Sequence, residues 1–276
     1  MSAESLEELA YRRLEEDRRT REVRVEMVRT DLVVPVAISW VWRDFLAGGE
    51  LHLLAGAPGS GKTTLAMEVA AVVSRGGTWP DNTVAPAGKV LIWTGEDGLE
   101  HTLIPRLIAA DADRSNVHVI QRVATDERSR VFDPALDLPL LEEAMHRMGN
   151  VRVVILDPIV SAVSGDSHKN TEVRRNLQPV VDLAQHTGAC VLGISHFSKG
   201  TAGRDAVERV TGSLAFAAVA RVVLVTVSGR GDADERPRAL IRAKSNLGPD
   251  GGGFGYGVEA IDVAEGVPAS RIAWQQ

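Results

Sequence analysis

The chain has 276 residues, a formal net charge of −6 and 44% hydrophobic residues. This length suffices for one domain with a full α/β core, and the composition is that of a globular protein. The acidic balance argues against a nucleic-acid binder that is basic over its whole surface, although it permits a local basic channel. The single cysteine, Cys190, excludes a disulfide within the chain. No signal-peptide pattern or membrane-spanning apolar run is recognisable, so we expect a soluble, cytosolic protein.

The first 30 residues form a segment that is dense in charge, with arginine and glutamate interleaved from Glu7 to Arg29. A narrow apolar stripe runs through it at helical spacing, made by Leu6, Leu9, Ala10 and Leu14. The stripe favours a helical arm that docks on a neighbouring subunit, and the alternative is a solvated arm that frays. We therefore expect residues 1–30 to be an arm and residues 31–276 to be one domain.

From residue 31 onward, predicted strands and helices alternate along the chain. We expect strands near 51–55, 89–94, 151–156, 189–194, 221–227 and 238–244. We expect helices near 62–75, 98–111, 139–148, 171–187 and 212–219. This order predicts an α/β fold with a mostly parallel central sheet and helices on both faces. Three glycines at 251–253 and the residues up to Trp274 predict a C-terminal β-hairpin extension.

The apolar strand at 51–55 leads into a glycine-rich loop that opens a helix. The loop and the first helical residues read G-x-x-x-x-G-K-T-T and comprise Gly56, Ala57, Pro58, Gly59, Ser60, Gly61, Lys62, Thr63 and Thr64. This context predicts a phosphate-binding P-loop, in which backbone N–H groups and the helix N-terminus face the phosphates. Lys62 supplies charge to the outer phosphates and Thr63 a hydroxyl for Mg²⁺. The alternative is a chance glycine-rich turn.

Two later strands end in carboxylates. The apolar run 151–156 delivers Asp157 to the Mg²⁺ shell, unless Asp157 and Pro158 merely form a turn. The run 89–94 ends in Gly95, Glu96 and Asp97, at the sheet edge where ligands collect. We favour Glu96 as the base that polarises the attacking water, and Asp97 as a helix cap or a supporting group.

An ordered set of motifs resembles the RecA-like P-loop ATPases of the plasmid replicative helicase RepA group, relatives of the DnaB-type hexameric helicases. The set consists of the P-loop, Gly95-Glu96-Asp97, the run V-V-I-L-D-P, Ile194-Ser195-His196 and Lys244-Ser245-Asn246-Leu247-Gly248. The similarity extends from about Val41 to Trp274. Many members of the wider group occur on phages and mobile elements, beside primases.

The resemblance implies roles for individual positions. Glu96 matches the catalytic glutamate, Asp157 the Mg²⁺-linked aspartate and His196 the sensor of the γ-phosphate. Arg221, after the segment that starts at Gly212-Ser213, resembles the arginine finger that reaches a neighbour's ATP. The alternatives are that His196 is a hydrogen-bonded structural histidine and that Arg221 is a strand-end arginine in a surface ion pair.

The sequence departs from the family at two places. DnaB-type proteins have an arginine finger in a Lys-x-Arg motif. In this chain Asn246 takes the position of that arginine, so only Lys244 of the motif can act on a neighbour's ATP. The plasmid helicase clamps adenine between an arginine, which Arg106 resembles, and a tyrosine, whose position is taken by Leu247. This departure weakens base stacking and adenine selectivity.

Contacts with DNA are expected from two loops that face the central channel of a RecA-like ring. These loops are residues 160–171 and 198–210, and their candidate phosphate contacts are Lys169, Lys199, Arg204 and Arg209. Neither loop contains an aromatic residue for base stacking, and nearby acids offset the positive charge. The alternative is a lid or a subunit contact without DNA.

These features together predict a Mg²⁺-dependent ATPase that forms a homo-oligomeric ring, a hexamer, with ATP between subunits. The leading function is a replicative helicase of a mobile element or phage that translocates on single-stranded DNA, with a primase or another replication protein as partner. The second hypothesis is a regulatory or scaffold ATPase that acts on a protein partner without unwinding DNA. A recombinase-like filament is a third, less favoured hypothesis.

Overall fold

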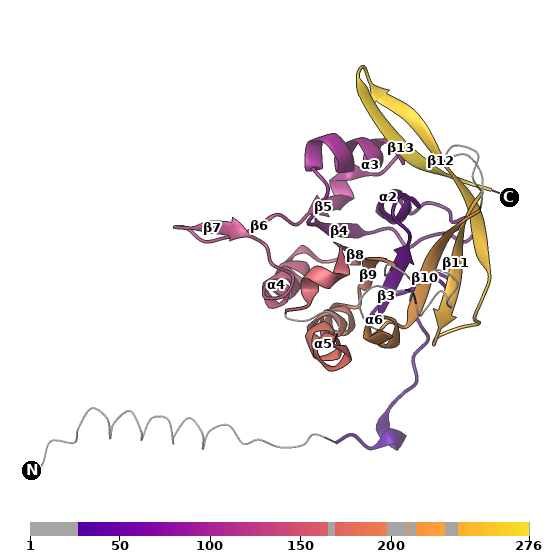
Figure 1. The fold of residues 1–276 in the computed structure, drawn as a ribbon. Coiled ribbons are helices and arrows are strands. Elements are labelled where there is room, and N and C mark those ends of the chain that lie inside the picture. Colours follow the sequence, from indigo (N-terminus) through magenta and orange to yellow (C-terminus); the bar gives the residue numbers. More distant parts are fainter. Residues whose placement is uncertain (1–26, 165–168, 198–208, 210–213, 230–236, 276) are drawn as a thin grey trace, which may run out of the picture. The chain divides into compact units, whose positions relative to one another are not determined.

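The structure is a computed structural model that describes residues 27–164, 169–197, 209, 214–229 and 237–275 (Figure 1). The chain forms two units, Met1–Ala37 and Ile38–Gln276. The described part of the first unit contains one 3-10 turn, Thr30–Leu32, and its residues are exposed. Most of the predicted helical arm lies outside the described residues, so the arm and its boundary stay predictions.

The second unit is built on a nine-stranded sheet with the order β13-β12-β11-β10-β3-β9-β8-β4-β5. The strands from β10 to β5 are parallel, and β11, β12 and β13 continue the sheet antiparallel. The parallel strands are β10 (Val222–Ser228), β3 (Leu51–Gly56), β9 (Cys190–His196), β8 (Val151–Asp157), β4 (Lys89–Thr94) and β5 (Val117–Val119). The antiparallel strands are β11 (Arg238–Ser245), β12 (Gly253–Ala264) and β13 (Val267–Trp274). The predicted mostly parallel sheet and the C-terminal hairpin are therefore confirmed.

Helices cover both faces of this sheet (Figure 1). One face carries α2 (Lys62–Arg75), the π-helical turn η2 (Leu99–Leu103) and α3 (Ile104–Ala109), and the other carries α4 (Leu138–Met148), α5 (Asn170–Thr187) and α6 (Leu214–Val219). Side chains of the central strands alternate between the two apolar cores: Val153 and Ile155 of β8 face α2, and Val154 and Leu156 face α5. Because successive side chains of a strand point to opposite faces, a continuous apolar run fills both cores.

Several short elements differ from the sequence prediction. The helix expected at 98–111 is divided, because a π turn precedes Ile104 and Pro105, which lacks an N–H, occupies the first turn of α3. Two small hairpins were not predicted, β1 (Trp40–Trp42) with β2 (Leu46–Ala47) and β6 (Arg122–Ala124) with β7 (Ser129–Val131), and neither were β5, η3 (Arg114–Asn116) and η4 (Ile159–Ala162). These segments are too short for a hydrophobic period to be recognised in the sequence.

The C-terminal hairpin is fixed against α2 by side chains from distant parts of the chain. Trp42 stacks on Trp79 with 4.5 Å between ring centroids, and Phe254 and Trp274 of the hairpin pack around it. The indole N–H of Trp274 also donates to Glu68 Oε1 of α2, at 3.4 Å. Large buried aromatic rings contribute much to packing energy, so this cluster holds the hairpin beside the helix that follows the P-loop. No helix within the described ranges combines the length and apolarity needed to cross a membrane.

Buried His52 is expected to make folding stability depend on pH. Its side chain is fully buried in β3 and its Nε2 accepts a hydrogen bond from the Ala47 N–H at 2.7 Å. Burial lowers the pKa of His52 from 6.5 to about 4. The unfolded chain therefore binds the extra proton first, and stability is lost as the pH falls from about 6.5 toward 4. The shift corresponds to about 3 kcal/mol of unfolding free energy.

Urea unfolding at pH 7.5, 6 and 5 measures this effect in the parent chain and in His52→Gln. We expect the substituted chain to lose clearly less stability on acidification than the parent. His146→Gln is the matched control, because the His146 side chain is 58% exposed on α4. Equal acid sensitivity of the parent and His52→Gln would show that another group carries the pH dependence.

Candidate nucleotide-binding site

The loop between β3 and α2 has a backbone that only glycine adopts easily at two positions. Gly59 and Gly61 have φ of 72° and 92°, in the left-handed region. At Gly56, an added β-carbon would lie 1.8 Å from Thr226 Oγ1 of β10. Glycine is therefore required at positions 59 and 61 by the backbone of the turn, and at position 56 by the close approach of a neighbouring strand.

Two downstream strands fix the shape of this loop. The Tyr256 hydroxyl of β12 donates to the Ser60 carbonyl at 2.7 Å, and Ser60 Oγ lies 2.6 Å from Thr226 Oγ1. Burial raises the pKa of Tyr256 to about 12, which keeps the phenol protonated as a donor. No local sequence pattern indicates these contacts, because the partners lie far apart along the chain.

Lys62 lies across the mouth of the loop. Its side chain is buried, and Nζ donates to the carbonyls of Gly56 at 3.2 Å and Ala57 at 3.0 Å. Burial lowers the pKa of Lys62, while the charges of Asp157 and Glu96 raise it. The ammonium is thus held beside the loop, where it can exchange carbonyl partners for phosphate oxygens.

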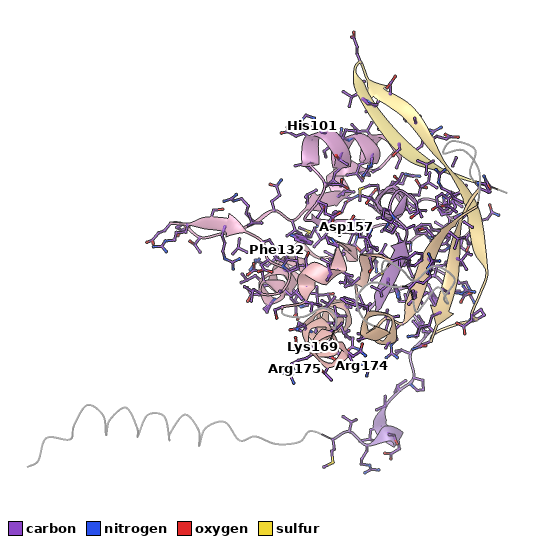
Figure 2. All side chains as sticks on the ribbon, in the orientation of Figure 1. His101, Phe132, Asp157, Lys169, Arg174 and Arg175 are labelled. Atoms are coloured by element: carbon purple, nitrogen blue, oxygen red, sulfur yellow. The ribbon has the colours of Figure 1, made fainter. Side chains whose placement is uncertain are left out.

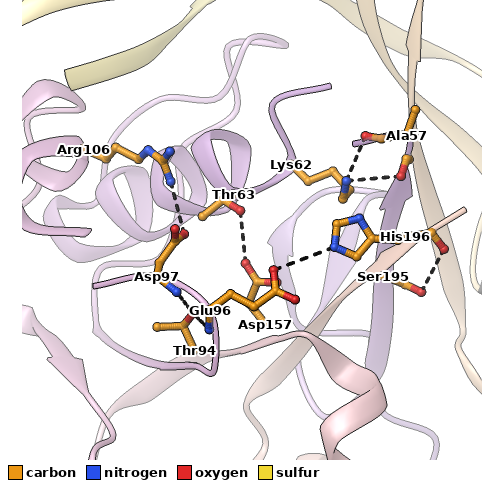
Figure 3. A network of polar contacts seen from close by, with 11 residues as sticks. Ala57, Lys62, Thr63, Thr94, Glu96, Asp97, Arg106, Asp157, Ser195 and His196 are labelled. Carbon is orange, nitrogen blue, oxygen red and sulfur yellow. Dashed lines mark hydrogen bonds and ion pairs between the residues drawn. The ribbon is translucent and has the colours of Figure 1, made fainter. Parts of the chain in front are cut away.

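Thr63 and Asp157 meet at the end of β8. Thr63 Oγ1 donates to Asp157 Oδ2 at 3.1 Å, as Figure 3 shows. Burial raises the pKa of Asp157 to about 6, and the hydrogen bond from Thr63 opposes this rise. An adjacent cation would stabilise the buried carboxylate in its charged form.

This pair fits Mg²⁺, which uses one or two protein oxygens and completes its shell with water and substrate phosphates. Among the described residues, no group of three or more His, Cys, Asp or Glu side chains could hold a metal ion.

Figure 3 shows Glu96, His196 and Asp157 side by side at the ends of neighbouring strands. His196 Nε2 lies 4.0 Å from Glu96 Oε2, and His196 Nδ1 is buried without a hydrogen-bond partner among the described residues. The sheet register explains the meeting, because Thr94 pairs with Asp157 and Gly56 with His196. Desolvation and the charge of Lys62 lower the pKa of His196, which favours a neutral ring, while Glu96 raises it.

Asp97 does not cap the following helix. The π turn η2 begins after Gly98 without a side-chain cap, and Asp97 Oδ2 instead accepts a hydrogen bond from Arg106 at 3.2 Å. The loop carrying Glu96 is also tied down by its own strand, since Thr94 Oγ1 accepts from the N–H groups of Glu96 and Asp97. Asp97 thus acts as a supporting group that orients Arg106.

The loop, the carboxylates, His196 and Arg106 enclose a cavity of about 310 Å³. It is lined by Gly59, Gly61, Lys62, Thr63, Thr64, Glu96, Arg106, Asp157, Ile194, His196, Arg238 and Val258. Arg238 and Val258 come from β11 and β12 and were not anticipated from the sequence. The site is therefore a pocket at the carboxyl edge of the parallel strands, closed on one side by the antiparallel extension.

Arg221 and Lys244 lie outside this cavity in the same chain. Arg221 Nε forms an ion pair with Glu50 at 3.3 Å. Lys244 Nζ donates to the carbonyls of Ala217 at 2.8 Å and Ala220 at 2.9 Å, at the end of α6. Neither residue reaches the P-loop of its own subunit, so any role of theirs in nucleotide chemistry requires a neighbouring subunit.

The predicted nucleic-acid contacts are only partly described. Lys199 and Arg204 lie outside the described residues. Lys169 Nζ pairs with Glu172 at 3.2 Å, and the Arg209 guanidinium lies 4.2 Å from the centre of the Phe197 ring. Phe197 thus provides an aromatic ring directly before the second loop.

Two further cations near the first loop were missed. Figure 2 labels Arg174 and Arg175 beside Lys169, and both are exposed on α5. Their position in the first turns of a helix that follows the loop was recognisable from the helical pattern. They add positive charge where the sequence prediction placed only Lys169.

Comparison with known proteins is consistent with the phosphate-binding architecture. Residues 16–202 match the family described as AAA domain. The chain is also 25% identical over 215 residues to the DNA repair protein RAD51 homolog 4 of Mus musculus, a match covering 74% of this chain and 63% of the mouse protein. The chain thus spans less than two thirds of that relative. By its family match and its fold, the chain belongs to the AAA domain family, within the RecA-like P-loop ATPases.

Proposed function

We propose that the chain is a Mg²⁺-dependent ATP hydrolase. The observation that carries this proposal is the convergence of Lys62, Thr63, Glu96, Asp157 and His196 on one cavity. A phosphate cradle alone would bind a nucleotide, whereas a nearby carboxylate that is 60% exposed can also polarise a water molecule. Binding and water activation are both needed for hydrolysis.

In the proposed mechanism, the P-loop N–H groups and Lys62 bind the phosphates. Thr63 and Asp157 are the residues that would hold Mg²⁺, and the ion would supply neutralisation of the phosphate charge. Glu96 orients the attacking water and takes its proton. A water molecule can reach the Glu96 carboxylate because this side chain is exposed to solvent. The unpartnered Nδ1 of His196 provides a hydrogen-bonding atom that responds to the presence of the γ-phosphate.

A homo-oligomeric ring, a hexamer, is the proposed assembly, with Arg221 and Lys244 completing the site of a neighbour. Both residues lie outside the cavity of their own chain, which is what a contribution across an interface requires. An exposed ion pair such as Arg221–Glu50 contributes only about 0–1 kcal/mol, so Arg221 can leave it for a phosphate at small cost.

The proposed work of the ATPase is translocation on single-stranded DNA, as a replicative helicase of a mobile element or phage. Support comes from the resemblance to the RepA group and from the exposed cations Lys169, Arg174 and Arg175 after β8. The similar mouse protein is named for DNA repair. A primase or another replication protein is the proposed further partner.

A regulatory or scaffold ATPase that acts on a protein partner is the second candidate. Two of the expected DNA contacts already have partners within the chain, since Lys169 pairs with Glu172 and Arg209 stacks on Phe197. With a net charge of −6, the chain also repels a polyanion outside any local basic channel.

The response of ATP turnover to single-stranded DNA distinguishes these candidates. For the translocase, we expect stimulation at low salt, and an affinity that falls with log salt by a slope of about −0.7 per phosphate contact. The double substitution Lys199→Ala and Arg204→Ala should remove the stimulation and leave basal turnover unchanged. Arg114→Ala, an exposed arginine on η3, is the matched control.

A defined negative result would reject the helicase proposal. If basal turnover is robust and oligomers form, yet no length or sequence of single strand changes turnover at low salt, the protein-partner function replaces it. The same measurement with Arg174→Ala and Arg175→Ala shows whether α5 contributes to the DNA contact.

A further inference from the structure

The phosphate cavity contains an arginine that no element of the P-loop pattern supplies. Arg238, at the start of β11, lines this cavity of about 310 Å³ together with Gly59, Gly61 and Lys62. It belongs to the antiparallel extension of the sheet, whereas the other charged groups of the cavity belong to the parallel part and its connections. Neither the water-activating groups nor the Thr63–Asp157 pair involves this guanidinium.

The sheet register brings Arg238 to the edge where the P-loop leaves the sheet. Thr226 of β10 is aligned with Gly56 of β3, and Ser228, at the end of β10, is aligned with Arg238. Leu240, two residues further along β11, packs in the core on the α2 face, and side chains two apart on a strand point to the same face. Arg238 therefore points to the face that carries α2, just beyond the level at which the P-loop begins.

Contacts between β12 and the loop fix this position. Arg238 is paired with Tyr256 of β12, whose hydroxyl donates to the Ser60 carbonyl at 2.7 Å. Val258 of the same strand lies 3.2 Å from the place that a β-carbon at Gly61 would occupy. The charge of Arg238 also acts to lower the pKa of Tyr256, against the larger effect of burial, so the guanidinium lies near the phenol. The backbone that carries Arg238 is thus held in place relative to the loop.

Arg238 and the carboxylates of the cavity lie on opposite sides of β3. In the sheet order, β10 and β11 follow β3 in one direction, and β9, β8 and β4, which lead to His196, Asp157 and Glu96, follow in the other (Figure 1). A phosphate held by the loop would meet the acids, and any cation that they bind, on one side only. Its oxygens on the other side would face β11, where Arg238 lines the cavity.

We propose that Arg238 binds the phosphates of the nucleotide within its own subunit, as a second cation beside Lys62. The inference rests on the proposed function, since it requires a P-loop that holds a polyphosphate. A guanidinium presents its N–H donors in a planar fork and can bind a phosphate through two parallel hydrogen bonds, whereas an ammonium acts as a point charge. Arg238 differs in position from Arg221 and Lys244, which lie outside the cavity of their own chain and are proposed to act on a neighbour.

Affinities of Mg²⁺-ATP and Mg²⁺-tripolyphosphate, measured by calorimetry on the full chain, test the inference. We expect Arg238→Ala and Arg238→Met to weaken both by the same factor, about 10- to 150-fold, the range for loss of a hydrogen bond to a charged group. Arg238→Met retains the aliphatic stem, so it separates lost charge from lost packing. Arg238→Lys should keep part of the affinity, because it retains the charge without the fork. Arg114→Ala, on exposed η3, should alter neither affinity.

Mixed oligomers distinguish this role from the role of Arg221. Arg238→Ala subunits mixed with Lys62→Ala subunits should show no more turnover than the two separate proteins together, because Arg238 and Lys62 act on a nucleotide bound by one chain.

Parent-like affinities in Arg238→Ala or in Arg238→Met would overturn the inference, as would weaker binding of ATP alone or recovery of activity in joint oligomers. Failure of the proposed function looks different. In that case the parent chain would bind neither compound, or Lys62→Ala would leave both affinities unchanged.

Discussion

Replacing Glu96 with glutamine is expected to lower ATP turnover by about 10²- to 10⁴-fold while nucleotide affinity stays near that of the parent. An amide of the same shape cannot accept a proton from water. Glu96 is 60% exposed and lies beside His196 and Asp157, so the substitution removes no buried packing. Steady-state phosphate release and nucleotide binding, measured on the same preparation, separate the two effects.

Two comparisons make this result specific. Glu143→Gln, on the exposed surface of α4, should keep the parent rate. Lys62→Ala should lose both turnover and affinity, because it removes the only charged group that donates to the P-loop carbonyls in the described residues. If Glu96→Gln hydrolyses ATP at the parent rate, another residue is the general base, and Asp97→Asn would then be the next variant.

Removing the Arg221 guanidinium is expected to lower turnover by about 10³-fold or more without weakening ATP binding, if Arg221 stabilises transition-state charge in a neighbour. The loss should not arise from stability, because the Arg221–Glu50 pair is exposed and contributes little. Arg147→Ala, which breaks a comparable exposed pair with Glu143, is the matched control.

Mixed oligomers then test whether the arginine acts across the interface. Arg221→Ala subunits retain an intact P-loop, and Lys62→Ala subunits retain an intact Arg221. A mixture forms some interfaces with both groups, so part of the activity should return, in proportion to the fraction of such interfaces. No recovery in a mixture shown by mass to form joint oligomers would reject the role in trans.

The central part of the fold was predictable because its signals are local. An apolar strand, a glycine loop and a helix follow one another from Leu51 to Arg75, and β8 and β9 are continuous apolar runs. Each element is long enough for its pattern to show, and the alternation of strands and helices implies parallel pairing. Asp157 and Glu96 were identifiable for the same reason, since each follows the end of such a strand.

Other features depend on which distant segments the fold brings together. Sequence spacing does not show that Thr226 requires glycine at position 56, or that Tyr256 holds the Ser60 carbonyl. The position of Asp97 just before a helical segment predicts a helix cap. In the structure the π turn has no side-chain cap, and Asp97 accepts a hydrogen bond from Arg106, whose position is set by the packing of α3.

The sequence by itself determined the P-loop, the order of the main strands and the chemical types of the groups at their ends, because neighbouring residues carry those signals. Only the tertiary structure decided that β11, β12 and β13 extend the sheet and close the cavity with Arg238 and Val258. It alone placed Ser270 of β13 beside Thr64 of α2. Contacts between residues about 200 positions apart are fixed by sheet register and packing, and no local pattern encodes those.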